Sequence, residues 1–214
     1  VVKYCVDNKI PVTPGCSNPS DIEQAISLGL DMVKFFPAEA AGGLAMIKAM
    51  SAPYVNMKFM PTGGISAKNL NEYLSFNKII ACGGSWMVKD DLIKAGEFDK
   101  IEALTREAVE QMLGFELAHV GINETDEEAA DKTAGRFESI FGLGTAVEVM
   151  KTPGLGAKGH IGIRTNYIDR AVNYLENQGV EFNPSSAKYD DKGNLKAIYL
   201  KEEIGGFAVH LVQK

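Results

Sequence analysis

The sequence MVKFFP at residues 32–37 decides the fold that we expect for the first half of the chain. It is a short apolar run that ends at a proline and carries one lysine, Lys34. Similar runs recur at intervals of about 22 residues, with helical stretches between them. One of these stretches is 18–28, where Pro19 suits a first helical turn. They are 10–15 (IPVTPG), 56–61 (NMKFMP) and 78–84 (KIIACGG). This alternation predicts right-handed βαβ units with a parallel sheet.

Four such units are half of an eight-stranded α/β barrel. The sequence opens within a predicted helix at 1–8, and no strand comes before that helix. Because a parallel sheet normally has both faces and both edges covered, we expect a preceding segment that this sequence lacks. The predicted fold class is therefore α/β: residues 1–113 form the C-terminal half of a (β/α)8 barrel, closed by a helix over 97–112.

Residues 114–214 are predicted to form a second, α+β domain of paired βαβββ modules. The sequence HVGI at 119–122 recurs as HIGI at 160–163, and an amphipathic helix follows each copy. The first helix should start at the capping box Thr125-x-x-Glu128 and end near Gly142, and the second should span 166–179. Strands with turns at 191–193 and 205–206 follow the second helix, whereas the first copy has room for one clear strand, 145–150.

The composition is that of a globular protein. The chain has 214 residues, 45% of them hydrophobic and 23% charged, and a net charge of −6. No basic stripe with interleaved aromatic residues is present, so nucleic acid is not an expected partner. The three cysteines show no C-x-x-C spacing, which fits a reducing cytosol. No apolar run approaches the ~20 residues of a membrane helix and no signal pattern opens the chain, so we expect no membrane partner and a cytoplasmic protein.

Lys34 is the first candidate catalytic residue. An ammonium group among apolar residues near a strand end is costly unless it has a function, and desolvation would depress its pKa and free the amine to attack a carbonyl. A lysine that reaches the surface from a strand edge is the structural alternative. Lys58 also lies three residues before a proline, so spacing alone does not rank the two lysines.

Two glycine-rich loops follow consecutive predicted strands, at 61–65 (PTGGI) and 83–86 (GGSW). Glycines let backbone N–H groups approach an anion closely, and the helix after each loop points its positive end at the same place. In eight-stranded α/β barrels, the loops after the last two strands commonly bind phosphate. Phosphate is therefore the predicted occupant, and two ordinary tight turns are the alternative.

The stretch from 14 to 50, PGCSNPSDIEQAISLGLDMVKFFPAEAAGGLAMIKAM, together with FMPTGGIS, ACGGSWMV and GEFDKIEALTREAV, resembles the 2-keto-3-deoxy-6-phosphogluconate (KDPG) and 4-hydroxy-2-oxoglutarate (KHG) aldolases. The resemblance implies a lyase that forms an imine between Lys34 and a 2-keto acid without a cofactor. It would release pyruvate with glyceraldehyde 3-phosphate or glyoxylate. It also implies a homo-oligomer, a trimer in that family. Phe36 would line the pocket, and the residues that would hold the substrate and its phosphate are Thr62, Gly63, Gly64, Gly84 and Ser85.

The family's general acid/base glutamate, and the arginine and threonine near the substrate carboxylate, lie on earlier strands that this sequence lacks. Carbon–carbon cleavage needs a group that takes the hydroxyl proton, so we expect the chain as given to be inactive or nearly so. Glu39 is the nearest substitute in the sequence, and its position favours a role at a helix terminus or on the surface.

All three histidines lie in predicted strands of the second half. Together with Glu148 on a fourth strand, His119, His160 and His210 could close around a divalent ion such as Zn, Ni or Fe. This arrangement resembles the glyoxalase and bleomycin-resistance group, the vicinal oxygen chelate fold, whose metal ligands lie on the first and last strands of paired modules. That group more often has a glutamate where His210 stands, and histidines that face a groove without metal remain an alternative.

The sequence thus predicts an imine-forming aldolase, and two other functions stay open. One places the chemistry in the second domain, as a metal-dependent isomerase or lyase. The other is a non-catalytic module that binds a small ligand, in which Lys34 pairs with a carboxylate.

Overall fold

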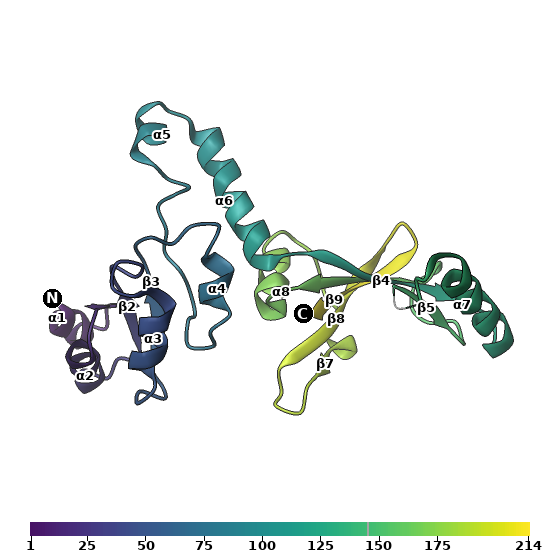
Figure 1. The fold of residues 1–214 in the computed structure, drawn as a ribbon, viewed down its shortest axis with the longest axis horizontal. Coiled ribbons are helices and arrows are strands. Elements are labelled where there is room, and N and C mark those ends of the chain that lie inside the picture. The colour runs from purple at the N-terminus through teal and green to yellow at the C-terminus, as the bar shows by residue number, and fades with distance from the viewer. Residues whose placement is uncertain (145) are drawn as a thin grey trace. The chain divides into compact units, whose positions relative to one another are not determined.

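The computed structural model describes residues 1–144 and 146–214, and the chain forms two compact units, Val1–Val109 and Glu110–Lys214. Each unit mixes helices with a sheet (Figure 1), which confirms the predicted mixed α/β class. Helix α6 (Phe98–Leu113) carries the chain from the first unit into the second. None of the helices in these described residues is long and apolar enough to cross a bilayer.

The first unit contains a parallel sheet of β1 (Gly15–Cys16), β2 (Met32–Phe35) and β3 (Lys58–Pro61), in that order. Two of the predicted strands are wrong in extent. The run 10–15 contributes only its last residue, because it contains two prolines, which cannot donate to a strand ladder. The run 78–84 forms isolated bridges at Ile79 and Gly83 instead of a strand.

The short helices of the first unit are α1 (Val2–Asp7), α2 (Pro19–Ser27), α3 (Gly43–Ser51), α4 (Leu70–Leu74) and α5 (Asp90–Lys94). Helix α2 begins where the sequence predicts, because the Asn18 side chain accepts a hydrogen bond from the Asp21 N–H at 3.0 Å. The core joins Phe35 and Phe59 of the strands to Ile22 and Ile47 of the helices, all fully buried. The half-barrel arrangement of these elements stays a prediction.

The second unit is built on a curled six-stranded sheet with the order β5-β4-β6-β9-β8-β7. Its elements are β4 (Glu116–Asn123), α7 (Glu127–Phe141), β5 (Val147–Met150), β6 (His160–Thr165), α8 (Ile168–Glu176), the short 3-10 helix η1 (Pro184–Ser186), β7 (Lys188–Tyr189), β8 (Leu195–Ile204) and β9 (Phe207–Gln213). The second predicted βαβββ module is present in full, since β6 is parallel to β9 and the β7–β8–β9 meander is antiparallel.

The first module is a shortened copy of the second. Strand β4 is parallel to β5, as β6 is to β9, and β4 and β6 pair antiparallel where the two modules meet. The hairpin that separates α8 from β9 has no counterpart between α7 and β5 in the described residues. The predicted single strand at 145–150 is observed as β5, and Thr145 lies outside the described residues.

The predicted cap of α7 is wrong by one residue. Asp126, not Thr125, precedes the helix, and its carboxylate accepts a hydrogen bond from the Ala129 N–H at 2.9 Å. Thr125 donates to that same carboxylate at 3.1 Å, which lowers the Asp126 pKa further after the backbone hydrogen bond. The predicted end of α7 at Gly142 is confirmed, with Gly142 in the left-handed conformation that ends many helices.

Candidate functional site

In the first unit, Lys34 lies on the central strand, in register with Gly15 and Met60. Val33 and Phe35 on either side of it are fully buried, so the Lys34 side chain occupies the opposite face of β2. It is partly exposed. No carboxylate forms an ion pair with Lys34 within the described residues.

The register separates the two lysines that spacing could not rank. Lys58 pairs with Met32, at the start of β3, and its Nζ donates to the Asn77 carbonyl at 3.4 Å. Lys34 lies two residues further along the parallel strands, nearer to their carboxyl ends. In α/β sheets and barrels, ligands bind at that edge.

Phe36 links Lys34 to the first glycine loop. The Lys34 Nζ lies 4.8 Å from the centroid of the Phe36 ring, within the range of a cation–π contact. Gly63 has a φ of +92°, and a Cβ added there would meet the Phe36 ring and the Pro37 backbone at 3.2 Å. Lys34, Phe36 and Gly63 therefore form a contiguous group.

The second glycine loop lies beside the first. Thr62 and Gly83 form a parallel bridge, and the Gly83 N–H donates to the Pro61 carbonyl at 3.0 Å. Beyond this bridge, the backbone N–H groups of Gly63, Gly64, Gly84 and Ser85 have no hydrogen-bond acceptor among the described residues. The Thr62 hydroxyl is buried and also lacks a partner there. Unused donors on neighbouring loops can bind an anion.

Glu39 has a structural contact. Its carboxylate accepts a hydrogen bond from the Tyr73 hydroxyl, and a Cβ at Gly64 would collide with its side chain at 2.5 Å. Burial raises the pKa of Tyr73, and the negative charge of Glu39 raises it further. This contact joins the loop after β2 to α4, and it supports the non-catalytic role that the sequence favoured for Glu39.

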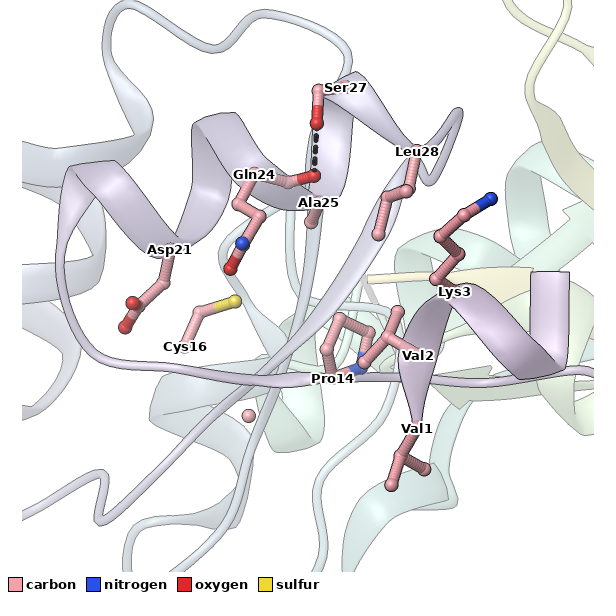
Figure 2. A pocket seen from close by; sticks show the side chains of 11 residues that line it. Val1, Val2, Lys3, Pro14, Cys16, Asp21, Gln24, Ala25, Ser27 and Leu28 are labelled. Atoms are coloured by element: carbon pink, nitrogen blue, oxygen red, sulfur yellow. Dashed lines mark hydrogen bonds between the residues drawn. The ribbon is translucent and has the colours of Figure 1, made fainter.

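A pocket of about 450 Å³ lies among α1, β1 and α2, away from these residues (Figure 2). Cys16 and Asp21 line it, together with Gln24. Burial, followed by the charge of Asp21, raises the pKa of the Cys16 thiol to about 11, so this cysteine stays a protonated thiol at neutral pH. None of the predicted site residues lines this pocket.

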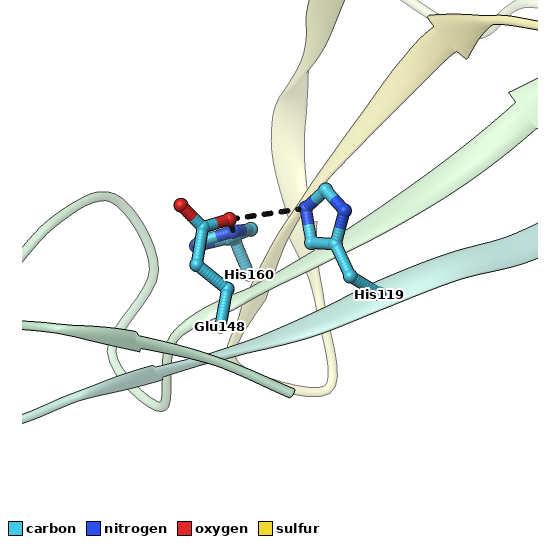
Figure 3. A group of neighbouring side chains, drawn as sticks. All are labelled: His119, Glu148 and His160. Carbon is cyan, nitrogen blue, oxygen red and sulfur yellow. Dashed lines mark hydrogen bonds and ion pairs between the residues drawn. The ribbon is translucent and has the colours of Figure 1, made fainter. Parts of the chain in front are cut away.

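In the second unit, His119, Glu148 and His160 form a compact group of possible metal ligands (Figure 3). One ligand atom from each residue lies within 4.8 Å of the others. The Glu148 Oε2 is 3.3 Å from the His160 Nε2 and 3.6 Å from the His119 Nε2. His160 is buried and Glu148 is half exposed, so the group opens to solvent on the carboxylate side.

His210 adjoins this group without entering it. Its ring centroid lies 5.1 Å from that of His119 and 5.4 Å from that of His160. The His119 Nε2 and the His210 Nδ1 are buried and lack hydrogen-bond partners among the described residues. Two unsatisfied imidazole nitrogens next to a carboxylate are a donor set that suits Zn, Ni or Fe.

Burial favours the neutral forms of His119 and His210, which are the forms that bind metal. It lowers the pKa of His210 to about 4, and the charges of His119 and His160 act in the same direction. Burial also lowers the pKa of His119, where Glu148 opposes the shift while His160 and Arg164 assist it. A neutral imidazole can donate a lone pair at neutral pH without first losing a proton.

Glycine opposite each of the two repeated histidines makes room for its ring. Gly121 pairs with His160, and a Cβ on Gly121 would lie 2.0 Å from the His160 Cε1. Gly162 pairs with His119, and a Cβ there would lie 2.6 Å from the His119 Cε1. The spacing His-x-Gly in both copies of the repeat was the signal for this, and sequence reasoning did not use it.

Residues 1–104 match the family model described as KDPG and KHG aldolase. The 2-dehydro-3-deoxy-phosphogluconate aldolase of Haemophilus influenzae is 49% identical over 110 residues, which are 51% of this chain and 52% of that protein. The KHG/KDPG aldolase of Escherichia coli is 42% identical over 110 residues, with the same two shares. The chain thus spans about half the length of the curated aldolases it matches.

Solved aldolase structures are also similar to the first unit. The KDPG aldolase of Legionella pneumophila, solved with pyruvate captured as a covalent carbinolamine, is 42% identical, with 44% of this chain and 46% of that chain covered and a TM-score of 0.43. The KDPG aldolase of Zymomonas mobilis with 3-phosphoglycerate is 39% identical, with 50% and 49% covered and a TM-score of 0.45.

Proposed function

We propose that the aldolase unit binds 2-keto acids as an imine on Lys34, and that it serves the cleavage of KDPG or KHG. The observation that carries the proposal is the contiguous group of Lys34, Phe36 and Gly63 at the carboxyl edge of the sheet. An amine at that edge lies beside the unused N–H groups of two loops. The match of residues 1–104 to the aldolase family model supports the same assignment.

The chemistry follows from the amine. The Lys34 nitrogen adds to the 2-keto carbon, and loss of water gives a protonated imine. This imine accepts the electron pair of the breaking C3–C4 bond, so the fragment that holds C1 to C3 remains as an enamine. Cleavage also requires a base for the C4 hydroxyl proton, a role that we assign to no residue of this chain. Protonation and hydrolysis of the enamine would then release pyruvate and the free amine.

The two glycine loops would bind the far end of the substrate. The N–H groups of Gly63, Gly64, Gly84 and Ser85 supply donors for phosphate, or for the terminal carboxylate of KHG. The buried Thr62 hydroxyl, which lacks a partner among the described residues, supplies another donor at the start of the first loop. The trimer and the cytoplasmic location expected from the sequence remain predictions.

Reductive trapping tests the imine. The chain is incubated with pyruvate and borohydride, digested, and mapped by mass spectrometry. We expect the reduced adduct on the peptide that contains Lys34, and its loss in Lys34→Met. Lys58→Met is the matched control, because Lys58 lies on the next strand and should be dispensable. An adduct spread equally over Lys34 and Lys58, or no adduct on either lysine, would refute the proposal.

We also propose that the second unit binds one divalent metal ion through His119, Glu148 and His160, with His210 as the adjoining donor. The unsatisfied nitrogens of His119 and His210 support this, because a buried polar atom without a partner is costly in a native protein. A bound divalent ion would polarise an oxygen atom of a ligand. A metal-dependent isomerase or lyase is the corresponding activity for this unit.

Elemental analysis after dialysis tests the metal site. We expect one equivalent of metal per chain in the wild type, and less than a tenth of that in the double variant His119→Ala/His160→Ala. Lys34→Met should keep the full equivalent, since its residue lies in the other unit. Metal that is absent from the wild type even after incubation with zinc would refute the site.

A further inference from the structure

We propose that the ligand of the histidine site is a small carboxylate, recognised by Arg164 and Lys188; this inference rests on the metal site proposed above. Both residues lie on the sheet face that carries the histidines. Arg164 and Lys188 would select the ligand, whereas the histidines and Glu148 would bind the metal.

Arg164 follows the histidines directly along β6. It is four residues after His160 and two after Gly162, so the alternation of a strand places all three on one face. The ring of His119 lies over Gly162, since a Cβ there would meet that ring at 2.6 Å. Arg164 is therefore the next side chain on this face beyond the imidazoles.

Lys188 lies on the same row of the sheet as Arg164. The register connects Arg164 to Val212 on β9, Val212 to Ala197 on β8, and Ala197 to Lys188 on β7. Three strand spacings of about 4.8 Å put the two cationic residues ~14 Å apart at the backbone. Two long side chains on a curled sheet can converge across that distance on a ligand of a few atoms, with only small apolar side chains between them.

Neither cation is neutralised by the protein. Arg164 and Lys188 are exposed and form no ion pair within the described residues. Glu116 is the acidic residue in register with Arg164, and its carboxylate pairs instead with Lys214 at 2.7 Å.

Tyr199 completes the surroundings of the ligand. It pairs with His210 across β8 and β9, and the two ring centroids are 4.5 Å apart. A tyrosine phenol is ordinarily protonated at physiological pH, so the Tyr199 hydroxyl is a neutral donor there. A carboxylate fits this set, because guanidinium and ammonium groups favour an anion and the phenol donates to one.

The test compares two probes that differ only in charge. Glycolate carries a hydroxyl beside a carboxylate, and glycolamide carries the same hydroxyl beside a neutral amide; neither forms an imine with a lysine. Each is titrated calorimetrically into the full chain, with one equivalent of zinc and after chelator treatment. The variants are Arg164→Gln and Lys188→Gln. Arg136→Gln on the exposed surface of α7 is the matched control.

We expect each variant to weaken glycolate binding about tenfold, while glycolamide binding and zinc content do not change. Zinc binding with unchanged glycolate affinity in both variants would overturn the carboxylate assignment and leave the metal site intact. If the wild type binds no zinc, the metal site fails. The chelator-treated titration then decides the remaining question: glycolate binding that depends on Arg164 supports the inference, and its absence overturns it.

Discussion

Replacing Gly121 by alanine is the sharpest perturbation of the histidine site. The added Cβ would lie 2.0 Å from Cε1, 2.2 Å from Nδ1 and 2.4 Å from Nε2 of His160, far closer than van der Waals contact allows. No rotation of the methyl group relieves such an overlap. The imidazole must leave its position, and its contact with the Glu148 carboxylate is lost with it.

Two opposing effects set the size of the change in stability. Alanine loses less backbone freedom than glycine on folding, which alone stabilises the protein by about 0.5–1 kcal/mol. Overpacking a filled site costs about 1–3 kcal/mol. We expect a net destabilisation of about 1–2 kcal/mol and at least a tenfold loss of zinc affinity, since one ligand is displaced.

Gly135→Ala is the matched control, because Gly135 lies in α7 and a Cβ added there meets no atom within 4 Å. This variant should be more stable by about 0.5–1 kcal/mol. Urea unfolding followed by circular dichroism measures both free energies, and calorimetry measures zinc binding. If Gly121→Ala gained stability as Gly135→Ala does, and bound zinc normally, the steric account of the His-x-Gly repeat would be wrong.

Three further predictions concern titration, capping and loop anchoring. In chelator-treated protein, stability should fall as the pH drops from 6.5 toward 4, because the pKa of folded His210, about 4, lies below its ordinary value of 6.5; the difference corresponds to at most about 3 kcal/mol, and urea unfolding of His210→Gln should show a flatter pH dependence. Asp126→Ala should cost about 1 kcal/mol in thermal unfolding and Thr125→Ala less than half of that, whereas equal losses would restore Thr125 as the cap. Tyr73→Phe should cost about 1–2 kcal/mol, because it leaves Glu39 without its donor, and an unchanged urea midpoint would contradict this.

The sequence predicted the elements that rest on strong local signals. Helix α2 begins at Asn18 and Pro19, and α7 ends at Gly142, because capping residues act through the nearest backbone groups. The last of the four apolar runs, residues 78–84, has the same strand-like pattern as the other runs, yet it forms only isolated bridges. A strand forms only where it pairs with neighbouring strands of the sheet, and the sequence of the run alone does not specify that pairing.

In the candidate sites, too, local motifs could be predicted from the sequence, whereas contacts between distant residues could not. Motif spacing identified Lys34 and the glycine loops, but only the register of β2 and β3 separates Lys34 from Lys58. The contact of Glu39 with Tyr73 joins residues 34 positions apart, and no periodicity in the sequence signals it. Tyr199 and Lys188 were missed because they belong to the histidine face only through pairing across strands.

The shortened first module keeps the strands that carry its two proposed metal donors, His119 and Glu148. Gly121 pairs with Glu148 as Gly162 pairs with His210, so the two halves contribute donors at equivalent positions of equivalent strands. All of these positions lie on the first and last strands of each module, and losing the intervening hairpin removes none of them. The hairpin of the second module carries Tyr199 and Lys188. The proposed metal donors are therefore paired across the two modules, whereas the hairpin groups proposed to select a ligand come from the second module alone. This asymmetry would orient a ligand within a nearly symmetric site.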